Sequence, residues 1–420
     1  MRTMRSVLLV AVFLGIIFSS CKKDEPTGPG GTGGPATING RVLSQQLVPL
    51  PNVPVVVPGR TPVNSDASGR FSIPDVTPPY TIVAVNIAER QVYVFEGVTR
   101  TDPTLTYLGS GVDTLRAASF SGTVHGGTYP QPGDHMTLLG VDSPQPARLL
   151  VGGLDSAFSV TVGWVGPTSV TGTVHALQWQ MQTTGLPSTY KGYGTIPNVT
   201  FTNGGSVSGA ILNLSAPGDT SASGTVIIPS GYTQVSQTLG LRVGQKIDFV
   251  LAFNESPTPG FNFIVPRTVG TPYLQVAYSA SGSSSLYYKT LSRGAGNAVT
   301  IPQGTQLILP PDHATNVDTS TVFSWTPLSG AVYRVHFMSP SPASPSYIIL
   351  TGGTSVSIPN LASFGLGLPS SVSYNWGVYA FESVGGVDGG TGPEGYLQVV
   401  GPSGDGGYSS AFGRSFSTRP

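Results

Sequence analysis

Charged side chains are scarce in this chain of 420 residues. Asp, Glu, Lys and Arg together make up 10% of the sequence, against roughly 25% in ordinary globular proteins. Acidic and basic side chains balance at 20 each, so the net charge is zero. Nucleic-acid binding depends on an excess of positive charge, which this chain does not have. The composition therefore argues against nucleic acid as a partner.

Residues that build long helices and catalytic sites are also few. The chain holds five Lys, six Glu and five His, so long surface helices are not expected. The sequence has no Gly-x-Ser-x-Gly, no His-Glu-x-x-His and no Gly-x-x-x-x-Gly-Lys, and no Gly-x-Gly-x-x-Gly follows a predicted strand. We expect a protein that is not an enzyme and that needs no cofactor or metal. The alternative is a hydrolase with an unrecognised site in residues 118–303.

Cysteine is nearly absent, and the single one stands at an informative place. Cys21 follows a segment that opens with Arg2 and Arg5 and continues with an apolar run over residues 7–18. This run has the length of a secretory signal and is shorter than the ~20 residues that span a bilayer. With no second cysteine, no internal disulfide can form, so packing must supply the stability.

The residues around Cys21 resemble those of bacterial lipoproteins. Phe18-Ser19-Ser20-Cys21 is similar to a lipobox, at which a precursor is cut before an acylated cysteine. Cys21 with Lys22 to Glu25 resembles the export signal of surface lipoproteins in the Bacteroidota. The resemblance implies a signal peptide over residues 1–20, lipidation of Cys21, and an outer-membrane location facing the cell exterior. The alternatives are a periplasm-facing chain and a merely solvated start to a linker.

Composition after Cys21 predicts a tether followed by an all-β protein. Gly and Pro fill much of residues 21–36, which have no side chains able to build a core and should form a flexible tether. Beyond it, short β-branched and aromatic runs alternate with turn residues. We expect serial β-sandwich domains at 37–115, 118–303 and 304–420.

Residues 37–115 carry a strand and turn pattern. Asp66 to Gly69 should form a turn, after which Phe71 and Ile73 share one face of a strand. The pattern resembles the carboxypeptidase regulatory-like family, a transthyretin-type sandwich. That resemblance implies an accessory module without catalysis, and it rests on Gly40, Val42, Pro51, Val55, Asp66, Gly69, Phe71 and Tyr80.

Residues 304–420 show a period of two. Tyr374, Trp376, Val378 and Ala380 should lie on one face of a strand. With Phe323-Ser324-Trp325 before it, this pattern resembles fibronectin type III-like modules of bacterial surface proteins. We interpret Trp325 and Trp376 as core residues, and the alternative is a pair of platforms on which a ligand stacks.

A long Gly-rich stretch at 383–410 interrupts this last pattern. Such a loop is either a binding loop or mobile. Its acids, Asp388, Glu394 and Asp405, are candidate Ca²⁺ ligands, but their spacing fits no dense oxygen-ligand loop. We predict no calcium site.

The middle region, 118–303, matches no family pattern. A phrase close to Ser-Gly-Thr-Val recurs at 121–124, 171–174 and 223–226. It indicates either three structural repeats or one large sandwich that reuses a strand opening.

Histidine and glutamine give the middle region two candidate sites. His125 and His175 follow two copies of the phrase and could bind a metal with Asp134 or His135, although half-exposed side chains are the simpler reading. The alternation around Trp179 sets three Gln on the opposite face of a strand. We expect a solvated face there, with sugar binding as the alternative, and the residues are Gln178, Gln180 and Gln182.

Together these patterns predict a lipid-anchored surface protein with a non-catalytic binding, display or envelope-structural role. The possible partners are the membrane through the lipid, a glycan, an envelope polymer or an outer-membrane protein. A carbohydrate-binding role predicts exposed rings among Trp164, Trp179, Trp325 and Trp376. A hydrolase role needs clustered acids, and we read Glu89 and Glu96, which flank a strand in the first domain, as belonging to an exposed face.

Overall fold

The computed structural model describes residues 34–44, 48–107, 115–128, 135–143, 147–148, 156–244, 247–255, 257–382, 384–393 and 405–420. Strands dominate these residues, and the predicted all-β class is confirmed. Helical residues are confined, within the described ranges, to a 3-10 turn, η1 (Ala362–Phe364), and one turn of α2 (Val387–Gly390). No helix in this part of the chain is long and apolar enough to cross a membrane.

The first sandwich consists of two sheets with the orders β4-β1-β7 and β3-β2-β5-β6. Its first strand pairs antiparallel with β4 and parallel with β7. Asp66 and Gly69 form the predicted turn, in which the Asp66 carboxylate accepts the amide of Ser68 at 2.8 Å. The strands are β1 (Ala36–Ser44), β2 (Pro54–Val56), β3 (Val63–Asn64), β4 (Arg70–Val76), β5 (Tyr80–Asn86), β6 (Gln91–Val98) and β7 (Thr104–Tyr107).

The middle region contains two sandwiches, each built on the same plan as the first. In the second, β8 lies between β11 and β14, and β12 lies between β9 and β13. Its short third strand, β10, adds to β11 instead of to β9. The strands are β8 (Leu115–His125), β9 (His135–Asp142), β10 (Ala147–Arg148), β11 (Ala157–Val165), β12 (Ser169–Met181), β13 (Pro187–Thr202) and β14 (Ser206–Asn213).

The third sandwich repeats the strand order of the first without change. Its sheets are β18-β15-β21 and β17-β16-β19-β20. The strands are β15 (Asp219–Ile227), β16 (Thr233–Val243), β17 (Ile247–Asn254), β18 (Gly260–Pro266), β19 (Thr271–Ala280), β20 (Ser283–Thr290) and β21 (Gly294–Thr300).

The recurring sequence close to Ser-Gly-Thr-Val lies in the first strand of a sandwich in two of its three occurrences. Residues 121–124 lie in β8 and 223–226 in β15, whereas 171–174 lie in β12, the fifth strand of the second sandwich. The true third copy is Asn39-Gly40-Arg41-Val42 in β1. In each opening strand the glycine stands opposite a phenylalanine of the antiparallel neighbour, in the pairs Gly40–Phe71, Gly122–Phe158 and Gly224–Phe261.

Close backbone approach explains this glycine. A Cβ on Gly122 would lie 2.0 Å from the carbonyl oxygen of Ala210 in β14, and one on Gly224 would lie 1.8 Å from that of Asn297 in β21. Both contacts are with the parallel neighbour, where the register shifts beside the glycine. The sandwich plan therefore requires a residue without a side chain at this position.

The fourth sandwich has the sheets β22-β24-β27 and β26-β25-β28-β29, with β23 running parallel to β29. Tyr374, Trp376, Val378 and Ala380 face its core as predicted. Trp325 and Trp376 are 1% and 2% exposed, which confirms them as core residues. The strands are β22 (Leu307–Leu309), β23 (Ala314–Val317), β24 (Phe323–Trp325), β25 (Val332–Met338), β26 (Ser346–Thr351), β27 (Ser355–Val356), β28 (Ser373–Phe381) and β29 (Gly406–Thr418).

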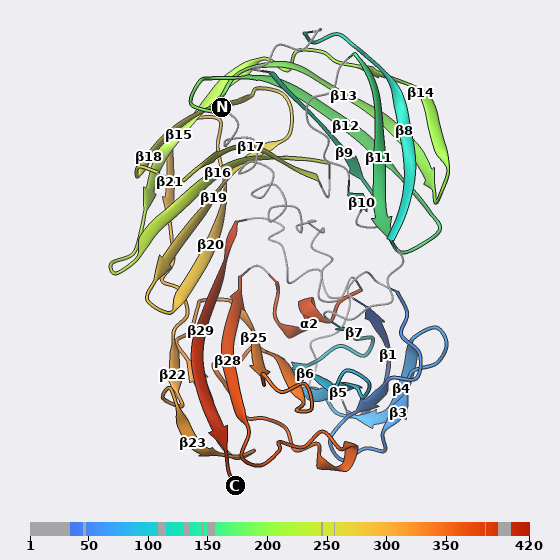
Figure 1. Cartoon of the computed structure of the whole chain (residues 1–420), viewed down its shortest axis with the longest axis vertical. Coiled ribbons are helices and arrows are strands. Elements are labelled where there is room, and N and C mark those ends of the chain that lie inside the picture. Colours follow the sequence, from blue (N-terminus) through green and yellow to red (C-terminus); the bar gives the residue numbers. More distant parts are fainter. Residues whose placement is uncertain are drawn as a thin grey trace.

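One 13-stranded sheet runs through the first, fourth and third sandwiches (Figure 1). On one side of the fourth sandwich, β26 pairs parallel with β6 from Ser346–Gln91 to Leu350–Phe95. On its other side, β29 pairs antiparallel with β20. Strand edges that each sandwich alone would leave open are thereby covered by a neighbour.

The hydrophobic cores of neighbouring sandwiches are also joined. Val83 and Val92, from the first sandwich, belong to the same core cluster as Tyr347 and Ile349 of the fourth. The second sandwich has no strand in the shared sheet, and it meets the third through Leu177 and Trp179 of β12. All four sandwiches are thus held to a neighbour by strand pairing or by a shared core.

We expect Gly224→Ala to destabilise the protein by roughly 1–3 kcal/mol, because its methyl group would overlap a backbone carbonyl that cannot move without breaking β21 pairing. The midpoint of urea unfolding, followed by tryptophan fluorescence, measures this change. Gly260→Ala is the matched control, since nothing lies within 4 Å of a Cβ built at that position in the same sandwich. Equal midpoints for the two variants would contradict the steric explanation.

Candidate functional site

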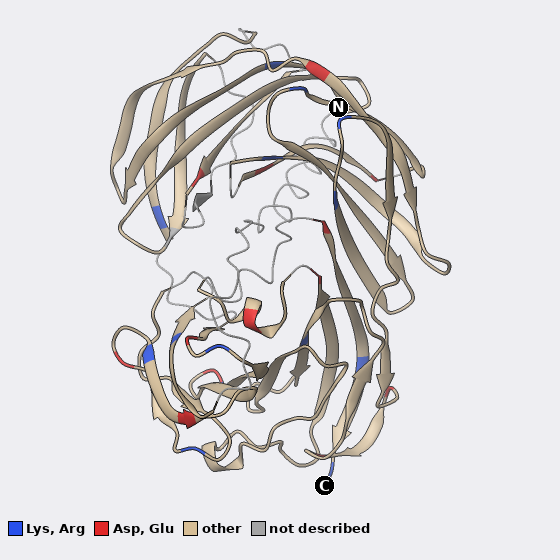
Figure 2. Ribbon diagram, turned by 180° about the vertical axis from the view of Figure 1, so that it is seen from behind, with Lys and Arg blue, Asp and Glu red and all other residues tan. Residues whose placement is uncertain are grey.

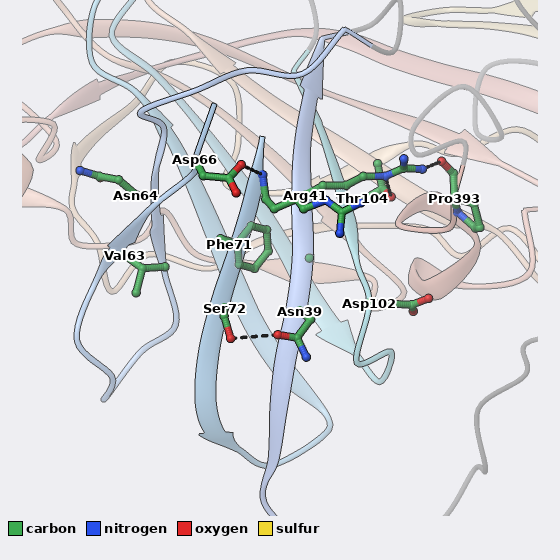
Figure 3. A pocket seen from close by; sticks show the side chains of 12 residues that line it. Asn39, Arg41, Val63, Asn64, Asp66, Phe71, Ser72, Asp102, Thr104 and Pro393 are labelled. Carbon is green, nitrogen blue, oxygen red and sulfur yellow. Dashed lines mark hydrogen bonds between the residues drawn. The ribbon is translucent and has the colours of Figure 1, made fainter. Parts of the chain in front are cut away.

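A polar groove with a volume of about 630 Å³ lies over the outer face of the β4-β1-β7 sheet (Figure 3). The alternation of each strand produces this face, because Ile38 and Val42 of β1 point into the core while Asn39 and Arg41 point outward. Phe71 and Ile73 of β4 likewise point into the core. The polar side chains left on the outer face include Asn39, Arg41, Arg70, Ser72 and Thr104.

The register sets these polar side chains in pairs. Arg41 stands opposite Arg70, and Asn39 stands opposite Ser72. The Ser72 hydroxyl donates to Oδ1 of Asn39 at 2.9 Å. Nε of Arg41 donates to the hydroxyl of Thr104 at 3.1 Å, which draws the guanidinium along the groove (Figure 3).

One wall of the groove comes from the far end of the chain. An Nη2 hydrogen bond joins Arg41 to the carbonyl oxygen of Pro393, and the amide of Thr104 donates to the carbonyl of Thr391 at 2.8 Å. The 384–393 segment thus docks on the first sandwich, although it belongs to the fourth.

Asp388, one of the calcium candidates, fastens this segment. Its Oδ1 accepts the amide of Thr99 at 2.8 Å and that of Arg100 at 3.3 Å, and Oδ2 accepts the Thr99 hydroxyl. The carboxylate therefore serves as a clasp between two sandwiches.

Asp405, a second calcium candidate, makes its contacts with the third sandwich. Oδ1 of Asp405 accepts the amide of Thr290 at 2.6 Å, and the carboxylate pairs with Lys289. Glu394 lies outside the described residues. No group of three or more His, Cys, Asp or Glu that could hold a metal occurs among the residues the structure describes.

The two histidines of the middle region have separate surroundings. His125 is exposed, and its Nε2 lies 3.2 Å from the Thr123 hydroxyl. His175 is buried, with Nδ1 2.8 Å from the Tyr193 hydroxyl, and burial lowers the pKa of this imidazole. His135 is buried on β9, and Asp134 lies outside the described residues.

The prediction that Gln178, Gln180 and Gln182 form a solvated face was wrong at Gln178. This side chain is fully buried, where its Oε1 accepts the amide of Thr128 at 2.8 Å and its Nε2 donates to the Thr137 hydroxyl at 3.2 Å. Both faces of β12 are covered, one by its own sandwich and the other by the third, so alternation does not separate core from solvent. Gln180 is half-buried and Gln182 exposed.

None of the four tryptophans forms an exposed platform. Trp164, Trp179, Trp325 and Trp376 are each at most 2% exposed. The two glutamates of the first domain differ. Glu89 is exposed, but Glu96 is half-buried, and burial raises its pKa while a hydrogen bond with Thr351 opposes that shift.

Two carboxylates of the middle region make internal contacts. Asp248 pairs with Arg242 at 2.9 Å, and Asp219 accepts the amide of Tyr190 at 2.8 Å. No family model matches this chain, and no curated protein matches it. The groove on the first sandwich is therefore the feature from which a binding role can be argued.

We expect Asp388→Ala to loosen the 384–393 segment, because three hydrogen bonds to a carboxylate would be lost. Hydrogen exchange of the Thr99 and Arg100 amides should become roughly ten-fold faster or more, as expected for losing bonds to a charged acceptor. Asp102→Asn is the control, since Asp102 is an exposed partner of Arg100 at 2.8 Å and contacts neither amide. Unchanged exchange in Asp388→Ala would show that the clasp does not hold the segment.

Proposed function

We propose that this protein is a lipid-anchored outer-membrane lipoprotein that faces the cell exterior and has a non-catalytic binding and scaffolding role. The proposed anchor is Cys21, and the Gly/Pro-rich composition of residues 21–36 predicts a tether. A flexible chain of that length has a root-mean-square reach of roughly 20 Å. The first sandwich, which carries the groove, follows the tether directly. A ligand held there would lie close to the membrane surface.

The observation that carries the scaffolding role is the 13-stranded sheet. Separate modules joined by linkers move relative to one another, whereas modules joined by strand pairing move as one body. Here β6–β26 and β20–β29 pairing makes the first, third and fourth sandwiches continuous. A rigid body of this kind suits a protein that holds a partner at a fixed distance from the membrane.

The strand orders support two family relationships as part of this proposal. The first three sandwiches share the β4-β1-β7 and β3-β2-β5-β6 plan in whole or in large part, and we infer that all three are carboxypeptidase regulatory-like modules. The fourth, with β23 running along β29, is inferred to be a fibronectin type III-like module. Both kinds of module serve as accessories in larger proteins.

The anchor is tested by replacing Cys21. We expect Cys21→Ala to abolish membrane retention, because no acylated cysteine would remain and stable anchoring requires two or more acyl chains. Fractionation of the producing cells measures the membrane-bound share. Ser20→Ala keeps a small residue before the cysteine and should remain bound. A membrane-bound Cys21→Ala protein would exclude lipid anchoring at this residue.

The orientation is tested by adding protease to intact cells. We expect the protein to be digested without opening the outer membrane, and we expect Asp24→Ala with Glu25→Ala to protect it by weakening the proposed export signal. Digestion after the outer membrane has been opened is the positive control for both. Protection of the unaltered protein on intact cells would place it on the periplasmic side.

A further inference from the structure

We propose that the groove on the first sandwich binds an acidic saccharide, with a carboxylate of the ligand held between Arg41 and Arg70. This inference rests on the binding role proposed above and names the ligand class for that site.

Two positively charged side chains face each other across the β1–β4 pair. Arg41 and Arg70 are directly opposed on one face of an antiparallel pair, where Cβ atoms lie roughly 4.5–5.5 Å apart and like charges repel. In a chain with so few charges, which Figure 2 shows as isolated blue and red segments, two adjacent cations are an unusual arrangement. An anion bound between them would relieve the repulsion.

The repeated sandwiches show that the fold does not require this pair. In the second sandwich, the residues opposed at the same register are Thr123 and Ala157. In the third they are Thr225 and Gly260. Both sandwiches form the same pairing without any charge at this place, so the two arginines belong to the first sandwich alone.

Donors for an anion remain on both guanidinium groups. Arg41 uses Nε on Thr104 and one Nη2 bond on Pro393, which leaves three of its five N–H donors. Within the part of the chain that the structure describes, the guanidinium of Arg70 makes no hydrogen bond or ion pair, and the side chain is exposed. Two planar guanidinium groups fit the two oxygens of a carboxylate.

The acids near the arginines are already engaged. Oδ1 of Asp66 accepts the amides of Ser68 and Arg70 at 2.8 and 2.9 Å. Asp102 pairs with Arg100 at 2.8 Å. Both carboxylates line the groove and keep their charge, but neither forms an ion pair with Arg41 or Arg70 among the described residues. Guanidinium donors therefore remain available to an external anion.

Neutral groups beside the arginines suit sugar hydroxyls. Oδ1 of Asn39 accepts a hydrogen bond from the Ser72 hydroxyl. The amide nitrogen of Asn39 can therefore donate to a sugar hydroxyl. Asn64 also lines the groove and is exposed. The volume of about 630 Å³ falls within the roughly 300–1,000 Å³ of small-molecule sites. The groove therefore has room for more than a single carboxylate, and its lining offers amides to a polyol.

Isothermal titration of the full-length mature protein in detergent micelles tests the proposal, with trigalacturonate as the probe. We expect saturable binding that weakens as salt is added, because the arginine pair attracts the carboxylate through charge. The fully methyl-esterified trimer has the same rings without the charge and should bind at least ten-fold more weakly. Inorganic phosphate distinguishes a site for any small oxyanion from a site for an acidic sugar.

Arg70→Gln should weaken trigalacturonate binding by about ten- to a hundred-fold, as expected for losing hydrogen bonds to a charged group. Arg70 is exposed and has no described side-chain partner, so this variant should fold normally. Arg419→Gln, an exposed arginine in the fourth sandwich, is the matched control and should bind as the unaltered protein does.

Three results would overturn the proposal. They are no saturable binding of trigalacturonate, with or without binding of phosphate, equal binding of the methyl ester, and equal binding by Arg70→Gln. These measurements use purified protein, so they are independent of where the protein lies in the cell. Contrary results in the anchoring and protease experiments would overturn the proposed location, but they would not contradict binding of an acidic saccharide in the groove.

Discussion

Backbone hydrogen bonding between edge strands of different sandwiches is the interaction on which this structure depends. The single cysteine allows no internal disulfide, and few ion pairs join the sandwiches among the residues that the structure describes. An open strand edge is a strong site for pairing. Pairing of β6 with β26 and of β20 with β29 uses those edges within the molecule. The fourth sandwich consequently lies between the first and the third, and residues far apart in sequence share one sheet.

This arrangement also creates the groove. The first sandwich supplies its floor, from the outer face of β1 and β4, but the wall belongs to the 384–393 segment of the fourth. Asp388 holds that segment through the Thr99 and Arg100 amides. Pairing of β26 with β6 brings the two sandwiches close enough for this clasp, so the strand pairing and the candidate site are structurally linked.

Repetition and specialisation are both visible in the opening strands. A glycine stands opposite a phenylalanine in β1, β8 and β15. In β8 and β15 the backbone of the parallel neighbour lies too close for a side chain, and in β1 the Phe71 ring and the Pro103 carbonyl leave no room for one. The outward positions beside it are not constrained in that way, and they differ among the three sandwiches. Arginines at two of these positions therefore reflect a property of the first sandwich and not a requirement of the shared plan.

The sequence alone determined the β class, the turn at Asp66 to Gly69 and the core face of β28, because alternation and turn chemistry are local properties of the chain. It also predicts a lipidation site at Cys21, which lies outside the described residues. The tertiary structure decided two features that no local sequence pattern encodes, the burial of Gln178 and the wall of the groove. Gln178 is buried because its side of β12 faces the interior of its own sandwich, whereas Leu177 and Trp179 on the opposite side pack against the third sandwich. The groove is walled by Pro393, some 350 residues from Arg41. Both outcomes depend on which strand edges and faces meet, and that is a property of the whole fold.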